Sequence, residues 1–395
     1  MTWRVRKAAK KPKGRLLLVS AGALALFTQM GALSLWPQSV SGTWKVIPGI
    51  ATRAAFLPLG QDIAVVSAND IWQVGYATTG HWDGSAWTAI SPSGSFVSLS
   101  GVAGVATNDV WAVGNAPDAT HGENAVTEHW NGSAWSIVPA PNGSTNPNGL
   151  TASQLVSVAA VSSNNVWAVG WTSTFFNFNS FQGTLIEHWD GSQWTVIPSP
   201  NVNGSSQNAL TGIAVIDAND IWAVGYTLTG NYQTLTEHWD GSQWSIVPSP
   251  NVGDYGNQLS GVTALASNDV WAVGSSNNYT NTLVLHWDGS SWGVVSSPKF
   301  SCIRSTSSLA SISAVSPTDI WAVGTNAFTY YTGEGDANTT YYTLFEHWDG
   351  SAWSIVPGAS TNGTSAVGRL FGVAAASTGD VWAVGPNLTE RFTIP

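Results

Sequence analysis

The sequence contains little cysteine, little methionine and little charge. Cys302 is the single cysteine among 395 residues, which excludes an intramolecular disulfide. Charged residues make up only 9% of the chain, whereas its 41 glycines and its abundant Ser, Thr and Asn suit a secreted β-protein. Stability must therefore come from apolar packing, which a chain of this length can supply.

Basic residues are scarce beyond the N-terminus. Seven of the 13 lysines and arginines lie within residues 1–15, and all 23 acidic residues lie beyond residue 40. Residues 41–395 thus hold six basic and 23 acidic side chains, a formal charge of −17. Such a domain repels phosphate backbones, so the composition excludes nucleic acid as a partner.

Helical spacing of apolar residues is absent, and a repeat fills the chain instead. Each unit reads Asn/Asp-Asp-Val/Ile-Trp-Ala-Val-Gly, a spacer, and Glu-His-Trp-Asp-Gly-Ser-x-Trp-Ser-Ile-Val-Pro. The first tryptophan of the unit occurs at Trp72, Trp111, Trp167, Trp222, Trp271, Trp321 and Trp382. The steps average about 52 residues, a period typical of propeller blades rather than of helical solenoids.

Four short β-type segments make up each unit. In the clearest copy we expect strands at 210–216, 221–225, 234–239 and 244–247, with a long loop between the second and third. Asp240-Gly241 makes a tight hairpin because glycine accepts a positive φ. Pro248 ends the last strand because proline donates no N–H. Four antiparallel strands in a meander form one blade.

The two ends of the chain complete one blade between them. The last unit ends at Pro395 before any fourth strand, and residues 41–48 match the fourth strand of the clearest copy. We therefore expect an all-β fold, a seven-bladed β-propeller with four-stranded antiparallel blades. Its ring would be closed by the N-terminal strand (41–48) completing the C-terminal blade, which removes exposed sheet edges.

These motifs resemble known propeller repeats. A strand ending in Gly, a strand ending in aromatic-Asp, and then Trp and Pro-x-Pro are similar to kelch units over residues 41–395. A single glycine such as Gly225 stands where kelch units carry a doublet. The Asp-Gly-Ser-x-Trp turn resembles the Asp-box of sialidase-type propellers, without the residue between Asp and Gly. The Trp-Asp pair is similar to WD40 units, without their Gly-His. The resemblance implies a kelch-like bacterial propeller.

The N-terminus has the pattern of an export signal. Basic residues 4–15 precede an apolar run at 16–36, typical of a signal peptide or a signal anchor. Residues 1–40 are therefore set apart from a propeller domain at 41–395. The positive-inside rule places that domain outside the cytoplasm, either secreted or anchored to the membrane by its N-terminal segment.

Most residues that invite a catalytic interpretation belong to the repeat. Twenty of the 23 tryptophans occupy repeat positions, which favours packing between blades. Six histidines recur once per blade and cannot converge on a metal ion, so we expect hydrogen bonds between blades. The aspartates of the tight turns, such as Asp220 and Asp240, are expected to bond turn backbone. The glutamates before the histidines, such as Glu237, are interpreted in the same way.

No enzyme signature is complete. Cys302 lacks the context of a galactose-oxidase-like copper site, and Arg53, Arg304 and Arg369 do not form a sialidase-like triad pattern. No pair of carboxylates outside the repeat is marked for glycoside hydrolysis. The sequence predicts no catalytic residue, metal or cofactor. A calcium site at 334–338 has oxygen-bearing residues but lacks a full loop motif.

Variation is concentrated in the loops of one face. The loops between the second and third strands, and those between blades, emerge on the same side of the ring and vary in length. They carry aromatic residues beside amides, which suit sugar rings; the alternative is packing over the blades. The candidate ligand-binding residues are Trp171, Phe176, Tyr226, Tyr232, Tyr279 and Tyr331.

The sequence thus predicts an exported, non-catalytic binding propeller. Its partner would be a glycan or an extracellular protein, it would contact membrane only through the N-terminal segment, and it would be a monomer. Two alternatives stay open: a glycan-active enzyme using loop carboxylates such as Asp118, Glu123 or Asp254, and a structural spacer. The N-terminal strand enters from the short-turn face, which predicts that the loop face points away from the membrane.

Overall fold

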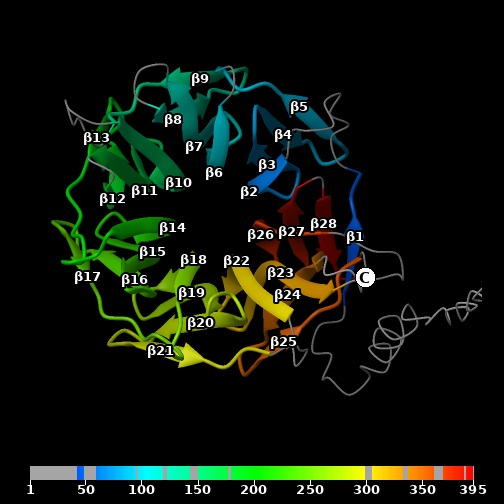
Figure 1. Ribbon diagram of the computed structural model, residues 1–395. Helices are drawn as coiled ribbons and strands as arrows, with labels where there is room; N and C mark the ends of the chain where they lie inside the picture. Colours follow the sequence, from blue (N-terminus) through cyan, green and yellow to red (C-terminus); the bar gives the residue numbers. More distant parts are fainter. Residues whose placement is uncertain are drawn as a thin grey trace, which may run out of the picture. The chain divides into compact units, whose positions relative to one another are not determined.

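The computed structural model describes residues 42–48, 59–94, 97–118, 122–142, 150–176, 179–298, 305–331, 337–359, 368–386 and 388–394. All of them belong to one compact unit, Ser41–Pro395. The named elements of the described residues are all β-strands, and the sheets are arranged in a ring around a central axis (Figure 1). In the described residues, no helix is long and apolar enough to cross a membrane.

Four layers of strands run from the axis outward (Figure 1). The innermost strands are β2 (Leu59–Ser67), β6 (Ser98–Ala106), β10 (Leu150–Ser162), β14 (Gln207–Asp217), β18 (Gln258–Ala266), β22 (Ser305–Ser316) and β26 (Gly372–Ser377). The second strands are β3 (Asp70–Gly75), β7 (Asp109–Asp118), β11 (Asn165–Phe176), β15 (Asp220–Thr229), β19 (Asp269–Ser276), β23 (Asp319–Tyr331) and β27 (Asp380–Gly385).

Two further layers complete the meanders. The third strands are β4 (Thr78–Trp82), β8 (Gly122–Trp130), β12 (Asn179–Trp189), β16 (Asn231–Trp239), β20 (Asn281–Trp287), β24 (Ala337–Trp348) and β28 (Leu388–Thr393). The outermost strands are β1 (Thr43–Val46), β5 (Trp87–Ile90), β9 (Trp135–Val138), β13 (Trp194–Val196), β17 (Trp244–Ile246), β21 (Trp292–Val295) and β25 (Trp353–Ile355).

The expected count of seven separate four-stranded blades is wrong. The described strands form five separate four-stranded sheets and one sheet of eight strands. A parallel bridge between Gln182 and Gln207 joins β12 to β14, and so merges the meanders β10–β13 and β14–β17. The physical reason is length: β14 begins at Gln207 rather than at Leu210, so its first residue lies beside the neighbouring meander.

The N-terminal strand occupies the place that the sequence predicts for it. β1 pairs antiparallel with β28, from Thr43 opposite Thr393 to Val46 opposite Glu390. The sheet order is β1-β28-β27-β26, so strands from both ends of the propeller chain share one blade. Trp44 of β1 is buried, and its ring lies 4.1 Å from that of Phe345 in the adjacent blade.

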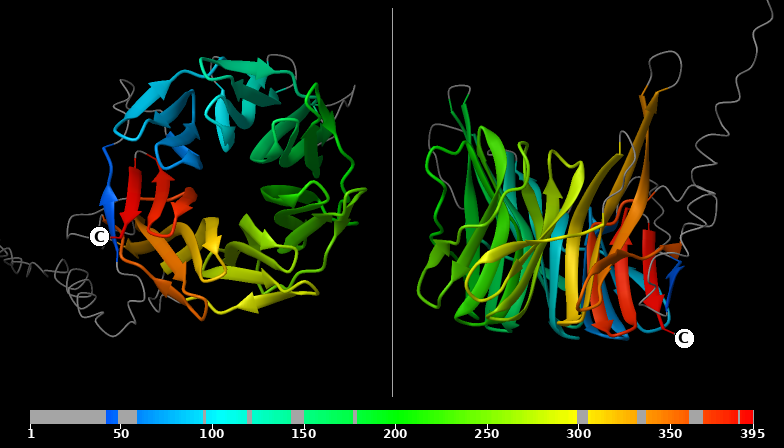
Figure 2. Two further views of the ribbon diagram at one scale, coloured as in Figure 1. Left: turned by 180° about the vertical axis from the view of Figure 1, so that it is seen from behind. Right: turned by 90° about the horizontal axis from the view of Figure 1, so that it is seen from below.

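Several segments expected as loops are strands. In the meander β14–β17, the second and third strands extend to Thr229 and Asn231 around Gly230, whose φ is +95°. In the blade β22–β25, β23 and β24 pair as far as Tyr331 and Ala337. Alternating Thr, Tyr and Phe residues favour the extended conformation in these segments. The long connections are therefore hairpins that project from the ring (Figure 2).

Tryptophans pack between blades, as the repeat predicts. Trp222 of β15 lies 4.9 Å from Trp287 and 5.3 Å from Trp292 of the next blade, measured between ring centroids. Trp72, Trp111 and Trp321 are likewise almost completely buried. Each such aromatic contributes a large apolar area to the core between neighbouring sheets.

Small residues allow the innermost strands to meet. Opposite the second-strand valine, six of these strands carry a Gly or Ser: Gly101, Ser157, Gly212, Gly261, Ser311 and Gly372. A Cβ added to Gly372 would lie 3.0 Å from the Cα of Asp62, so neighbouring backbones nearly touch here. Asp62 of β2 occupies the same position and is the exception in this ring.

Candidate functional site

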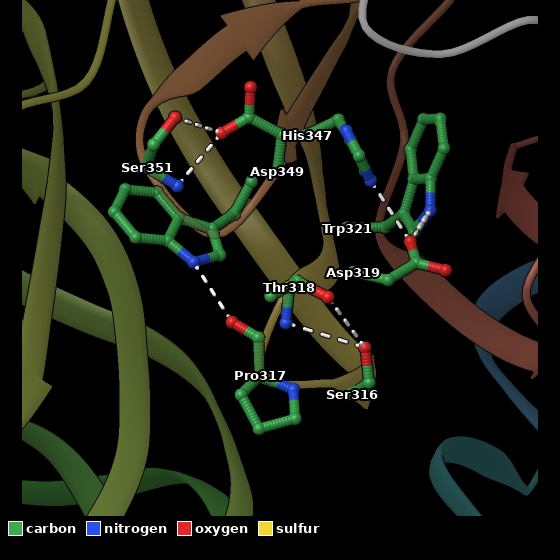
Figure 3. Close-up of polar contacts among 9 residues, drawn as sticks. Ser316, Pro317, Thr318, Asp319, Trp321, His347, Asp349 and Ser351 are labelled. Carbon is green, nitrogen blue, oxygen red and sulfur yellow. Dashed lines mark hydrogen bonds and ion pairs between the residues drawn. The ribbon is translucent and has the colours of Figure 1, made fainter.

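The repeated polar residues form a structural network on the face of the short turns. Figure 3 shows it for the blade β22–β25, where His347 Nε2 lies 2.9 Å from Asp319 Oδ1. The same oxygen accepts a hydrogen bond from Trp321 Nε1 at 3.0 Å, and the His347 and Trp321 rings lie 4.5 Å apart. The histidine therefore fixes the tryptophan that packs between blades.

This network corrects one expectation about the histidines. His81, His129, His238 and His286 also lie 2.8–2.9 Å from an aspartate of the second strand in their own blade. His188 bonds Asn165, and Arg391 makes two bonds to Asp380. The predicted bonds between blades are thus bonds within a blade. In the described residues, no group of three or more His, Cys, Asp and Glu gathers to hold a metal ion.

The turn aspartates divide into two kinds. Asp240 Oδ1 accepts hydrogen bonds from the hydroxyl and N–H of Ser242 and from the N–H of Gln243, as the turn interpretation predicts. The Ser242 hydroxyl and these N–H groups lower the pKa of Asp240 to about 2. Asp220, however, lies 2.8 Å from His238 Nε2, so its expected role in turn bonding is wrong.

The turn interpretation of the repeated glutamates is also wrong. Glu187, Glu237 and Glu346 are 0% exposed, inside the third strands. Among the described residues, neither carboxyl oxygen of any of the three has a hydrogen-bond partner. Burial raises the pKa of each to about 8. Each carboxyl is therefore neutral at neutral pH, which is the form that burial favours.

The opposite face of the ring carries the projecting hairpins. Figure 2 shows β23–β24 and the hairpins of the eight-stranded sheet rising on this one side, which we call the loop face. The hairpin β19–β20 is shorter: β19 spans eight residues, against ten in β15 and 13 in β23. All three strands begin at the aspartate of the repeated turn, so β19 ends lower on the loop face than its two neighbours, β15 and β23.

Three of the predicted site residues come together beside the hairpin β19–β20. Tyr226 of β15 and Tyr232 of β16 meet edge to face, with ring centroids 5.3 Å apart. Tyr279, in the turn before β20, is 49% exposed. Burial, and then the neighbouring Tyr232 and Tyr279, raise the pKa of Tyr226. We call these three residues the tyrosine cluster.

Tyr255 is an exposed aromatic residue next to the cluster that sequence reasoning missed. It lies between β17 and β18 and is 58% exposed. Its carbonyl accepts from the side-chain amide of Asn257, whose backbone N–H donates to the carbonyl of Tyr232. The sequence did carry a sign of it, because Tyr255 is an aromatic residue between Gly253 and Gly256 in a connection between blades.

The other predicted residues do not join the cluster. Trp171 lies in β11, opposite Gln154 and Thr184, and is half-buried. Phe176 and Tyr331 end β11 and β23, at the tips of two projecting hairpins. Their side chains lie outside what the structure describes. Residues 334–336 of the calcium-type segment lie outside it too, as do Cys302, Arg53 and Arg304.

Two further features of the described residues could suggest a site. A hollow of about 600 Å³ opens beside Asp269, His286 and Trp348, but these residues belong to the repeated network on the turn face. On the loop face, the guanidinium of Arg369 lies 3.7 Å from the centre of the Tyr341 ring. This cation–π pair is the one exposed arginine contact in the described loop face.

The fold places the protein among the β-propellers with four-stranded blades. No family model matches the chain, and none of the curated proteins compared with it matches, so kelch membership stays a prediction. Solved propeller structures are similar to it. One is YCF48 bound to a D1 peptide, with 13% identity, a TM-score of 0.55, and coverage of 91% of this chain and 96% of that one.

Two other structures show the same likeness. U3-55K has 10% identity and a TM-score of 0.52, and the match covers 89% of this chain and 98% of that one. The extracellular domain of a putative hybrid two-component system from B. thetaiotaomicron has 13% identity and a TM-score of 0.53. This match covers 89% of this chain and 40% of that one. At such identities the likeness establishes the fold alone.

Proposed function

We propose that this protein is an exported, non-catalytic binding propeller that holds a glycan or an extracellular protein on its loop face. The observation that carries the proposal is the variation of the loop face from blade to blade (Figure 2), with aromatic residues gathered there such as Tyr226, Tyr232 and Tyr279. Aromatic rings that are partly exposed and rigidly held are the side chains on which binding surfaces depend most.

The repeat supports a binding role over a catalytic one. The recurring His and Asp side chains bond each other on the turn face, and in blades such as β22–β25 the Trp bonds the same Asp. This leaves the loop face as the surface that differs from blade to blade. Glu123 and Asp254 of the enzyme alternative are exposed; Glu123 lies in β8 and Asp254 in the connection between β17 and β18. Nothing in the described residues pairs them as an acid and a base.

Export is proposed from the N-terminal pattern of basic residues followed by an apolar run at 16–36. One similar structure is an extracellular domain and another holds a bound peptide, which supports an extracytoplasmic interaction role by analogy of fold. The proposal places the propeller outside the cytoplasm in both cases, whether residues 1–40 are removed or are retained as an anchor.

The test is a pull-down of residues 41–395 on immobilised polysaccharides and on a peptide library, with and without calcium. We expect saturable binding that is weakened by Trp171→Ala or Tyr331→Ala on the loop face. Lys45→Ala on the outer strand β1 is the control and should bind normally. Hydrolysis of a polysaccharide would favour the enzyme alternative, and no binding to any probe would favour a structural spacer.

A further inference from the structure

The tyrosine cluster has a defined architecture. Tyr232 donates its hydroxyl to the side-chain carbonyl of Gln207 at 3.3 Å, and Tyr279 does the same to Gln258. Each pair joins a tyrosine near a hairpin turn to the first residue of the innermost strand in the same meander. Two aromatic rings are thus fixed beside two amide groups, next to the half-buried Tyr226.

The turn that presents Tyr279 is conformationally unusual. Asn277, Asn278 and Tyr279 have φ values of +54°, +54° and +67° in succession. A bulky side chain rarely adopts this left-handed region, and each such residue costs on the order of 1–3 kcal/mol. Surrounding hydrogen bonds hold the turn: Asn278 N–H donates to Gly256 O at 3.0 Å, and Ser307 N–H donates to Tyr279 O at 2.8 Å.

The described segments that form the cluster carry no cation. The segments at 205–210, 226–233, 251–258 and 275–280 contain no lysine or arginine, and Asp254 is their one ionisable residue besides tyrosine. Asp254 is exposed. An anionic ligand would find no counter-charge in these four segments and would be repelled by this carboxylate. The site chemistry is therefore aromatic faces together with neutral amides and hydroxyls.

The shape of the loop face favours a thin ligand. β23 is five residues longer than β19 from the same starting aspartate, a difference of about 16 Å at the rise of a strand. A broad protein surface would meet the taller hairpins before it reached Tyr279. An extended chain can lie lower, between the hairpins on either side of β19–β20 (Figure 2).

We propose that the tyrosine cluster, with Gln207 and Gln258, is a subsite for a sugar ring of an uncharged polysaccharide. The inference rests on the proposed function and deepens it, because it names the locus and the ligand class. The C–H face of a pyranose packs on a tyrosine ring, while its hydroxyls bond the glutamine amides and tyrosine hydroxyls. The strained turn keeps Tyr279 exposed to the ligand rather than folded onto the blade.

The experiment uses affinity electrophoresis and calorimetry of the propeller on three probe sets. These are neutral glucans, mannans and galactans; the anionic polygalacturonate and alginate; and a peptide library. We expect binding to at least one neutral polysaccharide. Tyr226→Ala and Tyr279→Ala should each weaken it about tenfold or more, as expected for loss of an aromatic anchor.

Tyr76→Ala is the matched control because Tyr76 follows Gly75 of β3 just as Tyr226 follows Gly225 of β15. It should bind like the parent. Tyr279→Gly separates folding from binding: glycine accepts the positive φ, so this variant should keep or raise the melting temperature while losing affinity.

The outcomes separate the two proposals. Neutral-glycan binding that is unchanged in the cluster variants would overturn the subsite and leave the binding propeller standing. Binding only to anionic glycans or to peptides would also overturn the subsite while supporting the proposed function. Absence of binding to all three probe sets would overturn both.

Discussion

At the scale of single residues, Asp62 stands out because its position is otherwise Gly or Ser. Its Oδ2 accepts the backbone N–H of Val102 in the next blade at 3.0 Å. Ser311 makes the equivalent contact from β22, where its hydroxyl accepts the N–H of Val373 at 3.3 Å. Although the Asp62 side chain is partly accessible, burial of its carboxyl among the innermost strands raises its pKa to about 7.

We predict that Asp62→Ser makes the protein less sensitive to alkaline pH. A carboxyl whose pKa is 3.8 unfolded and about 7 folded holds its proton more tightly in the folded state. The stability that it contributes is present below pH 3.8 and is lost as pH rises through 7. Serine keeps the acceptor for Val102 without the charge.

The check is thermal melting of both proteins from pH 4 to pH 8. The melting temperature of Asp62→Ser should exceed that of the parent at pH 8 and approach it at pH 4. A difference that does not change with pH would contradict the raised pKa.

At the scale of elements, the buried glutamates pair with the loops between blades. Six residues after the outer-strand tryptophan, Ser93 and Ala359 carry an N–H that donates to Glu128 and Glu390 of the next blade, at 3.0 and 2.8 Å. The same loop position is Pro141, Pro200, Pro250 or Pro298 in the other described connections. Proline has no N–H to donate.

The third strands that follow these prolines show the effect of the missing N–H. The next third strands carry Glu187, Glu237, Leu285 and Glu346, and the three glutamates are the buried carboxyls without a partner. The hydroxyl of Ser199 lies close enough to Glu237 to oppose the rise in its pKa, but it bonds Thr184 at 2.6 Å. Leu285 shows that an apolar side chain is accommodated at this position, where it is 0% exposed.

We predict that Glu237→Leu stabilises the propeller at alkaline pH. The pKa of Glu237 rises from 4.5 to about 8 on folding, so its contribution to stability is lost between these two values. The loss is at most about 1.4 kcal/mol for each pH unit. Chemical denaturation should show a gain at pH 8 that shrinks towards pH 4.5. Equal effects at both pH values would refute this account.

Two proline variants test the same contact from the loop side. Pro200→Ala supplies an N–H beside Glu237 and should stabilise the folded protein at pH 8. Pro250→Ala is its matched control, because its neighbour Leu285 has no carboxyl to bond. The control should be destabilised by only about 0.4–1 kcal/mol, because removing a proline gives the unfolded chain more conformational freedom.

At the scale of the whole molecule, β1 joins the two ends of the propeller chain. Trp44 is 5% exposed and contacts Phe392 of its own blade and Trp321 and Phe345 of the blade β22–β25. This strand of four residues therefore contributes both sheet pairing and core packing between two sheets.

We predict that Trp44→Ala lowers the free energy of unfolding by about 3–5 kcal/mol, the usual cost of truncating a buried aromatic. Lys45→Ala on the same strand is exposed and should change it by about 0.5 kcal/mol or less. Urea denaturation of the two variants measures both. Equal stability would show that β1 does not hold the ring closed.

The sequence by itself determined the blade unit. The repeated tryptophans, the glycines at tight turns and the match of 41–48 to an outer strand depend on local spacing, which a single chain displays directly. It also singled out the three members of the tyrosine cluster, as aromatic residues in variable connections, and missed Tyr255 beside them. Identical units pack in identical ways, so these inferences needed no coordinates.

Only the tertiary structure decided what happens where neighbouring sheets meet. The Gln182–Gln207 bridge merges two meanders, Glu237 is buried against a proline-containing loop, and Tyr232 approaches Tyr226 and Tyr279. These contacts arise between units whose surrounding residues differ. They depend on how far each hairpin extends and how closely two sheets approach, and no repeat within one unit carries that information.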